Sequence, residues 1–149
     1  MKKIFISAII ICSFFNSCTK NAVTGKRSLT LLPESEMMTM SVTEYQTFLS
    51  KNPPLPSSDE RVQLVKRSGL RIQKAVEKFY ADKGLSKDLQ GFNWEFNVVD
   101  NKEVNAWCMP GGKVVVYTGL LPVTQTEEAL AIVMGHEIAH AVARHGNQR

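Results

Sequence analysis

The stretch VMGHEIAHAVARHG at residues 133–146 contains the pattern His-Glu-x-x-His, formed by His136, Glu137 and His140. On an α-helix, residues four positions apart differ by about 40° around the axis and by one turn along it. Both imidazoles can therefore reach the same point, and neutral imidazole nitrogens bind zinc at about 2.0–2.1 Å. The pattern predicts a helix that holds one zinc ion through His136 and His140.

Glu137 follows the first histidine, so its carboxylate would lie beside a zinc-bound water rather than on the metal. There it can accept the proton of the water and pass it to the leaving amine, as the general base of peptide hydrolysis. The simpler alternative is a set of polar residues on a half-exposed helix. The chain has only 3 histidines, and chance gives this pattern on the order of once in a hundred or less. We therefore favour the metal site.

The segment around the motif carries further helix signals. Thr124 and Glu127 fit a capping box, in which a threonine caps the helix and a glutamate three residues later bonds back to it. Gly146 fits the end of the same helix. The apolar side that we expect to be buried consists of Leu130, Val133, Met134, Ile138 and Val142.

A catalytic zinc site has three protein ligands, and His145 does not fit the third position. On a continuous helix it would lie about 140° around the axis from His140. The metzincin pattern would also require glycine at Ala143 and histidine at Gly146. Unless the helix ends first, we expect His145 to pack or to form a hydrogen bond, not to bind zinc.

The acidic residues before the motif do not supply a clear third ligand either. Glu127 and Glu128 precede the motif by more than two helical turns, about 12 Å or further. Glu95 and Glu103 stay open as candidates, with nothing that selects either one. We expect the third ligand beyond Arg149, which would make this chain the N-terminal piece of a longer domain.

Two more helices are predicted upstream. Pro33 and the acids after it indicate the start of a helix over residues 34–50, because proline suits the first turn and acids suit the positive end of the helix dipole. Ser58 is the expected cap of a second helix over residues 59–82, which Gly84 ends. The expected packed faces are Met37, Met40, Tyr45, Phe48 and Leu49 on the first helix and Val62, Val65, Leu70, Ile72, Val76 and Phe79 on the second.

Two strands are predicted between these helices and the motif. Residues 92–100 alternate aromatic and polar side chains, the period-two pattern of a half-buried strand. Residues 113–119, KVVVYTG, are β-branched and bounded by glycine, and a Pro110-Gly111-Gly112 turn precedes them. The expected fold class is α+β, mainly helical, with a small antiparallel sheet beside the helix that carries the motif.

The first residues have the organisation of a secretion signal. Two lysines precede an apolar run at residues 4–15, which is too short to span a bilayer and suits a signal peptide. Cys18 follows this run directly after a small serine, as in the signals of bacterial lipoproteins, so we expect Cys18 to carry lipid. An ordinary signal peptide or an uncut anchor are the alternatives. The predicted division is a lipoprotein signal peptide at 1–17, a polar tether at 18–33 and a domain at 34–149.

The remaining cysteines and the charge exclude some classes of protein. Cys12 would leave with the signal and Cys108 would remain alone, so no disulfide framework is expected and Cys108 is predicted to be packed and unreactive. The formal net charge of +4 includes two lysines of the leader, and no basic stripe alternates with aromatic residues. We therefore expect no nucleic-acid partner.

The segments NAWCMPGGKVVVYTGLL and TEEALAIVMGHEIAHAVARHG together resemble the gluzincin metallopeptidases, the family of the CAAX prenyl endopeptidases and HtpX-type proteases. The segment AVTGKRSLTLLPESEM is similar to the Oma-like and BepA-like lipoprotein branch of that family. The resemblance implies a zincin-like fold, His136 and His140 as ligands, Glu137 as general base, and a glutamate on a later helix as third ligand. It also implies that the Pro110-Gly111-Gly112 turn and the strand KVVVYTG lie beside the cleft. An exposed strand edge there would hold an extended substrate by β-augmentation. The candidates for that edge are Gly111, Gly112, Val114, Val115 and Val116.

The expected function is zinc-dependent endopeptidase activity on misfolded or misassembled proteins of a bacterial cell envelope. The expected location is the periplasmic side of a membrane, reached by the lipid anchor. One alternative is a non-catalytic envelope lipoprotein that binds or chaperones its partners. A second is a cytoplasmic or inner-membrane-anchored protein, if the leader is not cut.

Overall fold

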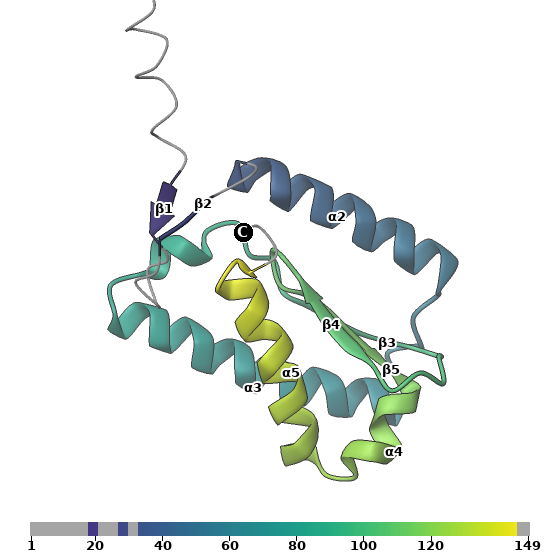
Figure 1. Cartoon of the computed structure of the whole chain (residues 1–149). Helices are drawn as coiled ribbons and strands as arrows, with labels where there is room; N and C mark the ends of the chain where they lie inside the picture. Colours follow the sequence, from purple (N-terminus) through teal and green to yellow (C-terminus); the bar gives the residue numbers. More distant parts are fainter. Residues whose placement is uncertain (1–17, 21–26, 30–32, 146–149) are drawn as a thin grey trace, which may run out of the picture.

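A three-stranded sheet lies between one helix on one face and two helices on the other, in a computed structural model that describes residues 18–20, 27–29 and 33–145 (Figure 1). The prediction for the signal peptide lies outside these residues. Gly146 also lies outside them, but the last helix already ends at Val142, four residues before the predicted end. The helices and strands are β1 (Cys18–Lys20), β2 (Arg27–Leu29), α2 (Glu34–Lys51), α3 (Glu60–Asp82), the 3-10 turn η2 (Ser86–Leu89), β3 (Glu95–Val99), β4 (Ala106–Met109), β5 (Lys113–Tyr117), the 3-10 turn η3 (Thr118–Leu120), α4 (Leu121–Thr124) and α5 (Glu127–Val142).

The N-terminal strands form a pair of their own. β1 and β2 run antiparallel, with Cys18 opposite Leu29, inside the segment predicted as a tether. Among the described residues, no helix has both the length and the apolar character needed to cross a membrane.

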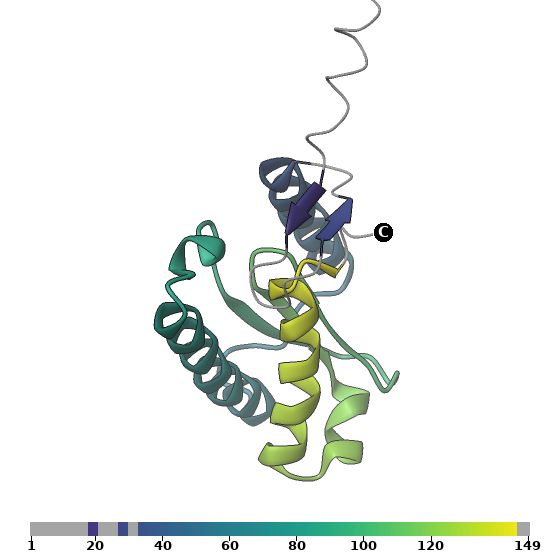
Figure 2. The same ribbon diagram turned by 60° about the vertical axis from the view of Figure 1, so that its left-hand side comes forward.

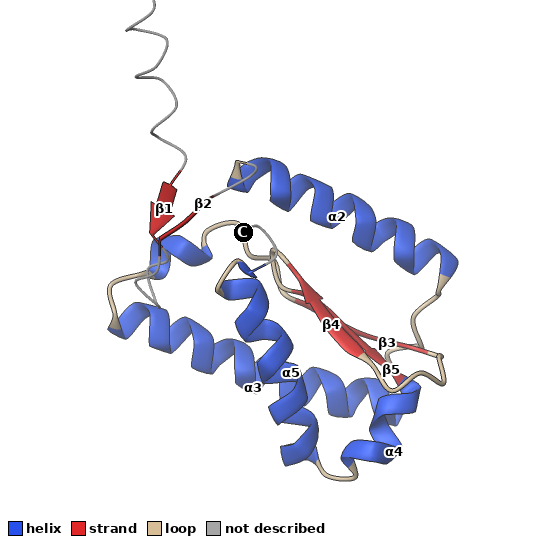
Figure 3. Cartoon of the chain, in the orientation of Figure 1, coloured by secondary structure: helices blue, strands red, loops and turns tan. Residues whose placement is uncertain are grey.

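The sheet has the order β3-β5-β4, with β3 and β5 parallel and β4 and β5 antiparallel. The expected class, α+β and mainly helical with a small sheet, is confirmed, but the sheet is mixed rather than wholly antiparallel (Figure 3). The reason is a strand that the sequence did not indicate. β4 lies in the connection between the two predicted strands and pairs with the far side of β5, which leaves β3 and β5 to run in the same direction.

The two faces of the sheet have different partners, because successive side chains of a strand point to opposite sides. Val114 and Val116 of β5 pack with α3 and α5, in a core that also holds Leu130, Met134 and Ile138. Val115 and Tyr117 point the other way and pack with Tyr45 of α2. β5 is buried along its whole length and is the centre of the structure.

The helix α2 follows Pro33 as predicted, with Glu34 and Glu36 in its first turn. Tyr45 is buried, and Phe48 and Leu49 pack around the same cluster. Met40 is not part of this face, since half of it is exposed. Ser41 occupies the buried position instead, where its hydroxyl donates to the carbonyl oxygen of Pro110 at 2.8 Å.

The helix α3 is capped by Asp59 rather than Ser58, and the Asp59 carboxylate accepts from the backbone N–H of Arg61 at 2.9 Å. Its buried stripe also differs from the prediction. Leu70 and Phe79 are exposed, whereas Ser68, Gly69 and Tyr80 are buried. The cause is the close contact between Gly69 and the ring of Phe96, where an added Cβ would collide. The helix therefore turns its small residues, rather than Leu70 and Phe79, towards the sheet.

The helix α5 begins two residues later than predicted. Thr126 is its cap and accepts from the backbone N–H of Ala129 at 3.1 Å, while Thr124 ends the separate short helix α4. Gln125 lies between the two helices with φ 59°, a left-handed conformation that ends α4 and changes the direction of the chain. Figure 2 shows α5 running alongside the sheet, with α3 beside it.

Candidate metal centre

His136 and His140 point to one place on the exposed side of α5. Their Nε2 atoms are 3.1 Å apart, and the ring planes meet at 75°. Two nitrogens that bind one tetrahedral zinc at 2.0–2.1 Å lie about 3.3 Å from each other. The separation of the two nitrogens is therefore close to that of two ligands of one metal ion.

The apolar side of α5 explains why these histidines face outwards. Leu130, Met134 and Ile138 have no exposed surface and fix the rotation of the helix against the sheet. Residues 136 and 140 lie on a different face of the helix, and both are exposed. The packing of the helix thus holds the pair open to solvent and to a ligand.

Glu137 is half-buried and directly precedes the buried Ile138 of α5. Its charge acts on the Cys108 thiol of β4, whose pKa is raised to about 12 by burial first and by the Glu137 carboxylate second. The thiol is therefore protonated at neutral pH, which agrees with the prediction of an unreactive cysteine.

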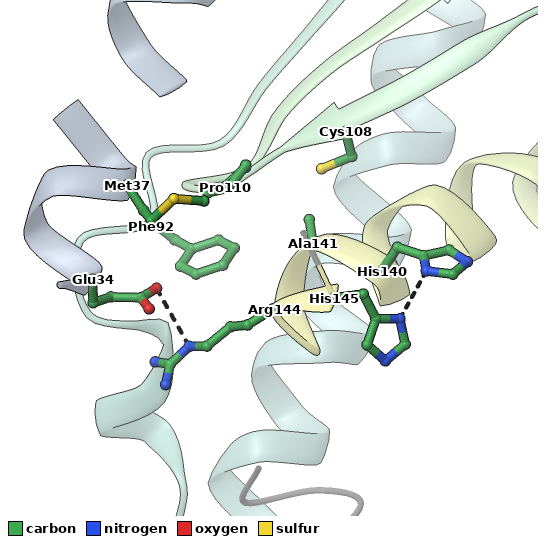
Figure 4. A pocket seen from close by; sticks show the side chains of 9 residues that line it. All are labelled: Glu34, Met37, Phe92, Cys108, Pro110, His140, Ala141, Arg144 and His145. Carbon is green, nitrogen blue, oxygen red and sulfur yellow. Dashed lines mark hydrogen bonds and ion pairs between the residues drawn. The ribbon is translucent and has the colours of Figure 1, made fainter. Parts of the chain in front are cut away.

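The end of α5 brings a third histidine to the site. The helix ends at Val142, and Arg144 has φ 59°, so the chain turns back before His145. The Nδ1 atoms of His145 and His140 are 2.8 Å apart (Figure 4). His145 thus forms a hydrogen bond, as predicted, and it reaches the ring nitrogen of His140 that is remote from His136.

A mostly apolar pocket of about 230 Å³ opens beside these histidines. Arg144 spans it and forms an ion pair with Glu34 of α2, with 3.3 Å between Nε and Oε1. The pocket is lined by Glu34, Met37, Phe92, Cys108, Pro110, His140, Ala141, Arg144 and His145, as Figure 4 shows.

The acidic residues considered as third ligands all lie elsewhere or have other partners. Glu127 accepts from Arg67 and from the hydroxyl of Ser68, and Glu95 accepts from Lys113. Within residues 18–20, 27–29 and 33–145, no three His, Cys, Asp or Glu side chains lie close enough together to hold a metal ion. The expectation of a third ligand beyond Arg149 stays a prediction.

The predicted substrate edge is wrong. Val114, Val115 and Val116 belong to β5, which is paired with β3 on one side and with β4 on the other. The carbonyl oxygens of Gly111 and Gly112 accept from the backbone of Asn93 and Glu95. These five residues therefore offer no continuous free edge to an added strand.

Among the residues that the structure describes, β4 lies at the edge of the sheet next to α5. The N–H of Tyr117 donates to the carbonyl of Asn105, and alternate residues of an antiparallel strand bond to the same neighbour. Trp107 and Met109 therefore face β5, while the backbone groups of Ala106 and Cys108 point outwards. A sequence signal for this strand existed only in the alternation of small and large side chains in AWCM.

Comparison with known proteins supports the interpretation of this helix. The model of peptidase family M48 matches residues 66–149. The mitochondrial metalloendopeptidase OMA1 of Bos taurus is 31% identical over 95% of this chain and 26% of its own length. The OMA1 of Arabidopsis thaliana is 46% identical over 50% of this chain and 15% of its own length. The β-barrel assembly-enhancing protease of Escherichia coli is 40% identical over 35% of this chain and 11% of its own length. The chain thus spans about a quarter or less of these relatives, and with the family model covering more than half of its residues, it belongs to peptidase family M48.

Proposed function

We propose that this chain carries the catalytic helix of a zinc-dependent endopeptidase. The observation that supports this most directly is the 3.1 Å separation of the His136 and His140 Nε2 atoms, with Glu137 next to His136 on the same helix. The family and its metalloendopeptidase relatives give the same chemistry. We expect the third protein ligand from a residue outside those that the structure describes.

Each residue of the motif has one role in this proposal. His136 and His140 would hold a zinc ion through their Nε2 atoms. A bound zinc lowers the pKa of its water to about 7 and polarises the carbonyl of the scissile bond. Glu137 accepts the proton of the attacking water and delivers it to the leaving nitrogen.

The substrate binds along β4 in this proposal. The outward N–H and carbonyl groups of Ala106 and Cys108 can pair with an extended peptide, which would add a fourth strand to the sheet. β4 packs directly against α5, the helix that carries Glu137, so a peptide held on β4 would lie beside the helix of the general base. An extended conformation is available only to unfolded or unpaired segments, which favours misfolded or misassembled proteins as substrates.

The cell envelope is the proposed place of action. The leader at residues 1–17 and Cys18 suggest a lipid anchor, and one relative is named for enhancing the assembly of β-barrel proteins. Labelling with radioactive palmitate should mark the chain, and Cys18→Ala should abolish the label. Equal labelling of both forms would exclude lipid attachment at Cys18.

The activity is tested by Glu137→Gln in the full-length gene product, with an unfolded reporter protein as substrate. Removing the general base should lower the cleavage rate by about 10²–10⁴-fold. Glu128→Gln is the matched control, because Glu128 is exposed on the first turn of the same helix. If Glu137→Gln keeps full biological function, that function does not depend on peptide hydrolysis, and the protein acts as a binder or chaperone.

A further inference from the structure

His140 has a neighbour at each of its two ring nitrogens. Its Nε2 lies 3.1 Å from Nε2 of His136, and its Nδ1 lies 2.8 Å from Nδ1 of His145. The rings of His140 and His145 are 4.9 Å apart between centroids and meet at 70°, so the two rings touch edge to face. His145 therefore contacts the side of His140 opposite to the proposed metal position (Figure 4).

This contact depends on an unusual backbone at the end of α5. On a continuous helix, His145 would be about 140° around the axis from His140. Instead Arg144 has φ 59°, a left-handed conformation that is uncommon for a residue other than glycine. The side chain of Arg144 is held by Glu34 at 3.3 Å and donates to the carbonyl of Asp88 at 3.4 Å. The turn is thus fixed by contacts to α2 and η2.

The chemistry of a metal-bound imidazole gives this contact a role. A histidine that binds a metal through Nε2 carries its proton on Nδ1, and that N–H needs an acceptor. Such an acceptor fixes the tautomer and the orientation of the ring. Nδ1 of His145 is an acceptor when its own proton is on Nε2, and it lies at hydrogen-bond distance.

We propose that His145 is a positioning residue for His140, which it holds in the Nδ1–H tautomer with Nε2 free to bind the metal. The proposal rests on His140 being a metal ligand, as proposed above. His145 itself is not a ligand of the same ion. The two nitrogens of an imidazole ring point away from each other, so a group bonded to Nδ1 of His140 is directed away from an ion at Nε2.

The first experiment uses the metal-free chain labelled with ¹⁵N. Two-bond ¹H–¹⁵N correlation spectra distinguish Nδ1–H from Nε2–H in each histidine ring. His140 should be mainly the Nδ1–H tautomer in the native chain and in His145→Asn, whose amide oxygen can take the place of the Nδ1 acceptor. In His145→Ala the preference should disappear. An unchanged His140 tautomer in His145→Ala would overturn the proposal, whatever the zinc affinity of that variant.

The second experiment measures zinc affinity by competition with a coloured chelator. Loss of the partner of a ligand histidine should weaken zinc binding about 10–100-fold in His145→Ala, whereas His145→Asn should stay within about threefold of the native chain. Equal losses in both variants would mean that His145 acts only by packing, which would contradict the proposal.

A third variant separates this inference from the function on which it rests. His136→Ala should abolish zinc binding and leave the His140–His145 contact intact. If His136→Ala binds zinc as well as the native chain, the proposed metal site is wrong, but the tautomer measurement still decides the role of His145. The backbone ¹H–¹⁵N spectrum of each variant shows whether the fold is retained.

Discussion

Lys113 carries a buried charge at the start of the central strand. Its side chain is only 4% exposed, and its ammonium donates to the carbonyl of Asn93 and to Oε1 of Glu95, both at 2.6 Å. The carboxylate of Glu95 is 42% exposed and also accepts from the hydroxyl of Tyr45 at 3.2 Å. The two halves of this ion pair therefore differ in their access to water.

This difference predicts unequal effects of removing either charge. Glu95→Met leaves a buried ammonium without its counter-ion, and breaking a buried pair in this way costs about 3 kcal/mol. Lys113→Met leaves a carboxylate that water can reach, and it fills the same apolar space. The loss is then about 1 kcal/mol, mainly for the carbonyl of Asn93 that loses its donor. The double variant should also lose about 1 kcal/mol, because no buried charge remains.

Urea denaturation followed by tryptophan fluorescence measures these values. The chain has 2 tryptophans, and both Trp94 and Trp107 pack against the sheet. The slope of the free energy of unfolding against urea should stay constant, so that midpoints report stability alone. If Glu95→Met is no worse than Lys113→Met, or if the two losses add in the double variant, the argument from unequal burial is refuted.

Three further predictions concern a cap, a close contact and a thiol. Thr126→Ala should lower the free energy of unfolding by about 1 kcal/mol by removing the cap of α5, and Thr124→Ala should lower it less; thermal unfolding compares the two. Gly69→Ala should cost about 1–3 kcal/mol because the new methyl group meets an aromatic ring of β3. Gly135→Ala, with open space around its Cβ position, should instead stabilise by about 0.4–1 kcal/mol in the same assay. The pKa of Cys108 is raised from 9.0 to about 12 in the folded chain, so its contribution to stability is complete below pH 9 and is lost as the pH rises towards 12. Cys108→Ala should flatten this alkaline decrease in urea titrations, and the native thiol should resist iodoacetamide at pH 7.

The parts that the sequence predicted correctly are those with local causes. The three long helices follow from apolar periodicity, with Pro33 before the start of α2 and Gly84 after the end of α3, signals that act within a few residues. The convergence of His136 and His140 is equally local, because helical geometry alone brings positions i and i+4 together. The α+β class follows once these helices surround two apolar strands.

The caps show where local signals stop being sufficient. Ser58 and Thr124 both have suitable side chains, yet Asp59 and Thr126 are the caps. A cap needs an extended backbone at its own position as well as an acceptor. At α5 this is decided by Gln125, whose left-handed conformation ends α4 and lets the chain restart two residues later. Side-chain preferences for capping positions do not predict this left-handed residue.

The positions that the sequence missed depend on contacts between distant segments. The packed face of α3 was misplaced because Gly69 lets the helix approach Phe96, and a glycine adds nothing to an apolar pattern. The place of His145 depends on the turn at Arg144, which is held by Glu34, 110 positions earlier in the chain. Periodicity within one helix cannot predict either arrangement.

The strand β4 connects the missed part of the fold with the proposed chemistry. Its side chains alternate between small Ala106 and Cys108, which pack on the side of α5, and large Trp107 and Met109, which pack on the side of α2. Along a strand, the side chains alternate between the two faces of the sheet, and the backbone N–H and carbonyl groups alternate between its two neighbours. Both patterns repeat every second residue, so the small residues of β4 are also those whose backbone groups point to the edge of the sheet. Small side chains there let α5 lie close to the strand, which α5 packs against directly. The pattern AWCM thus lets α5, the helix that carries Glu137, lie close to the edge strand β4. A bulky residue at position 106 or 108 should move α5 away from β4.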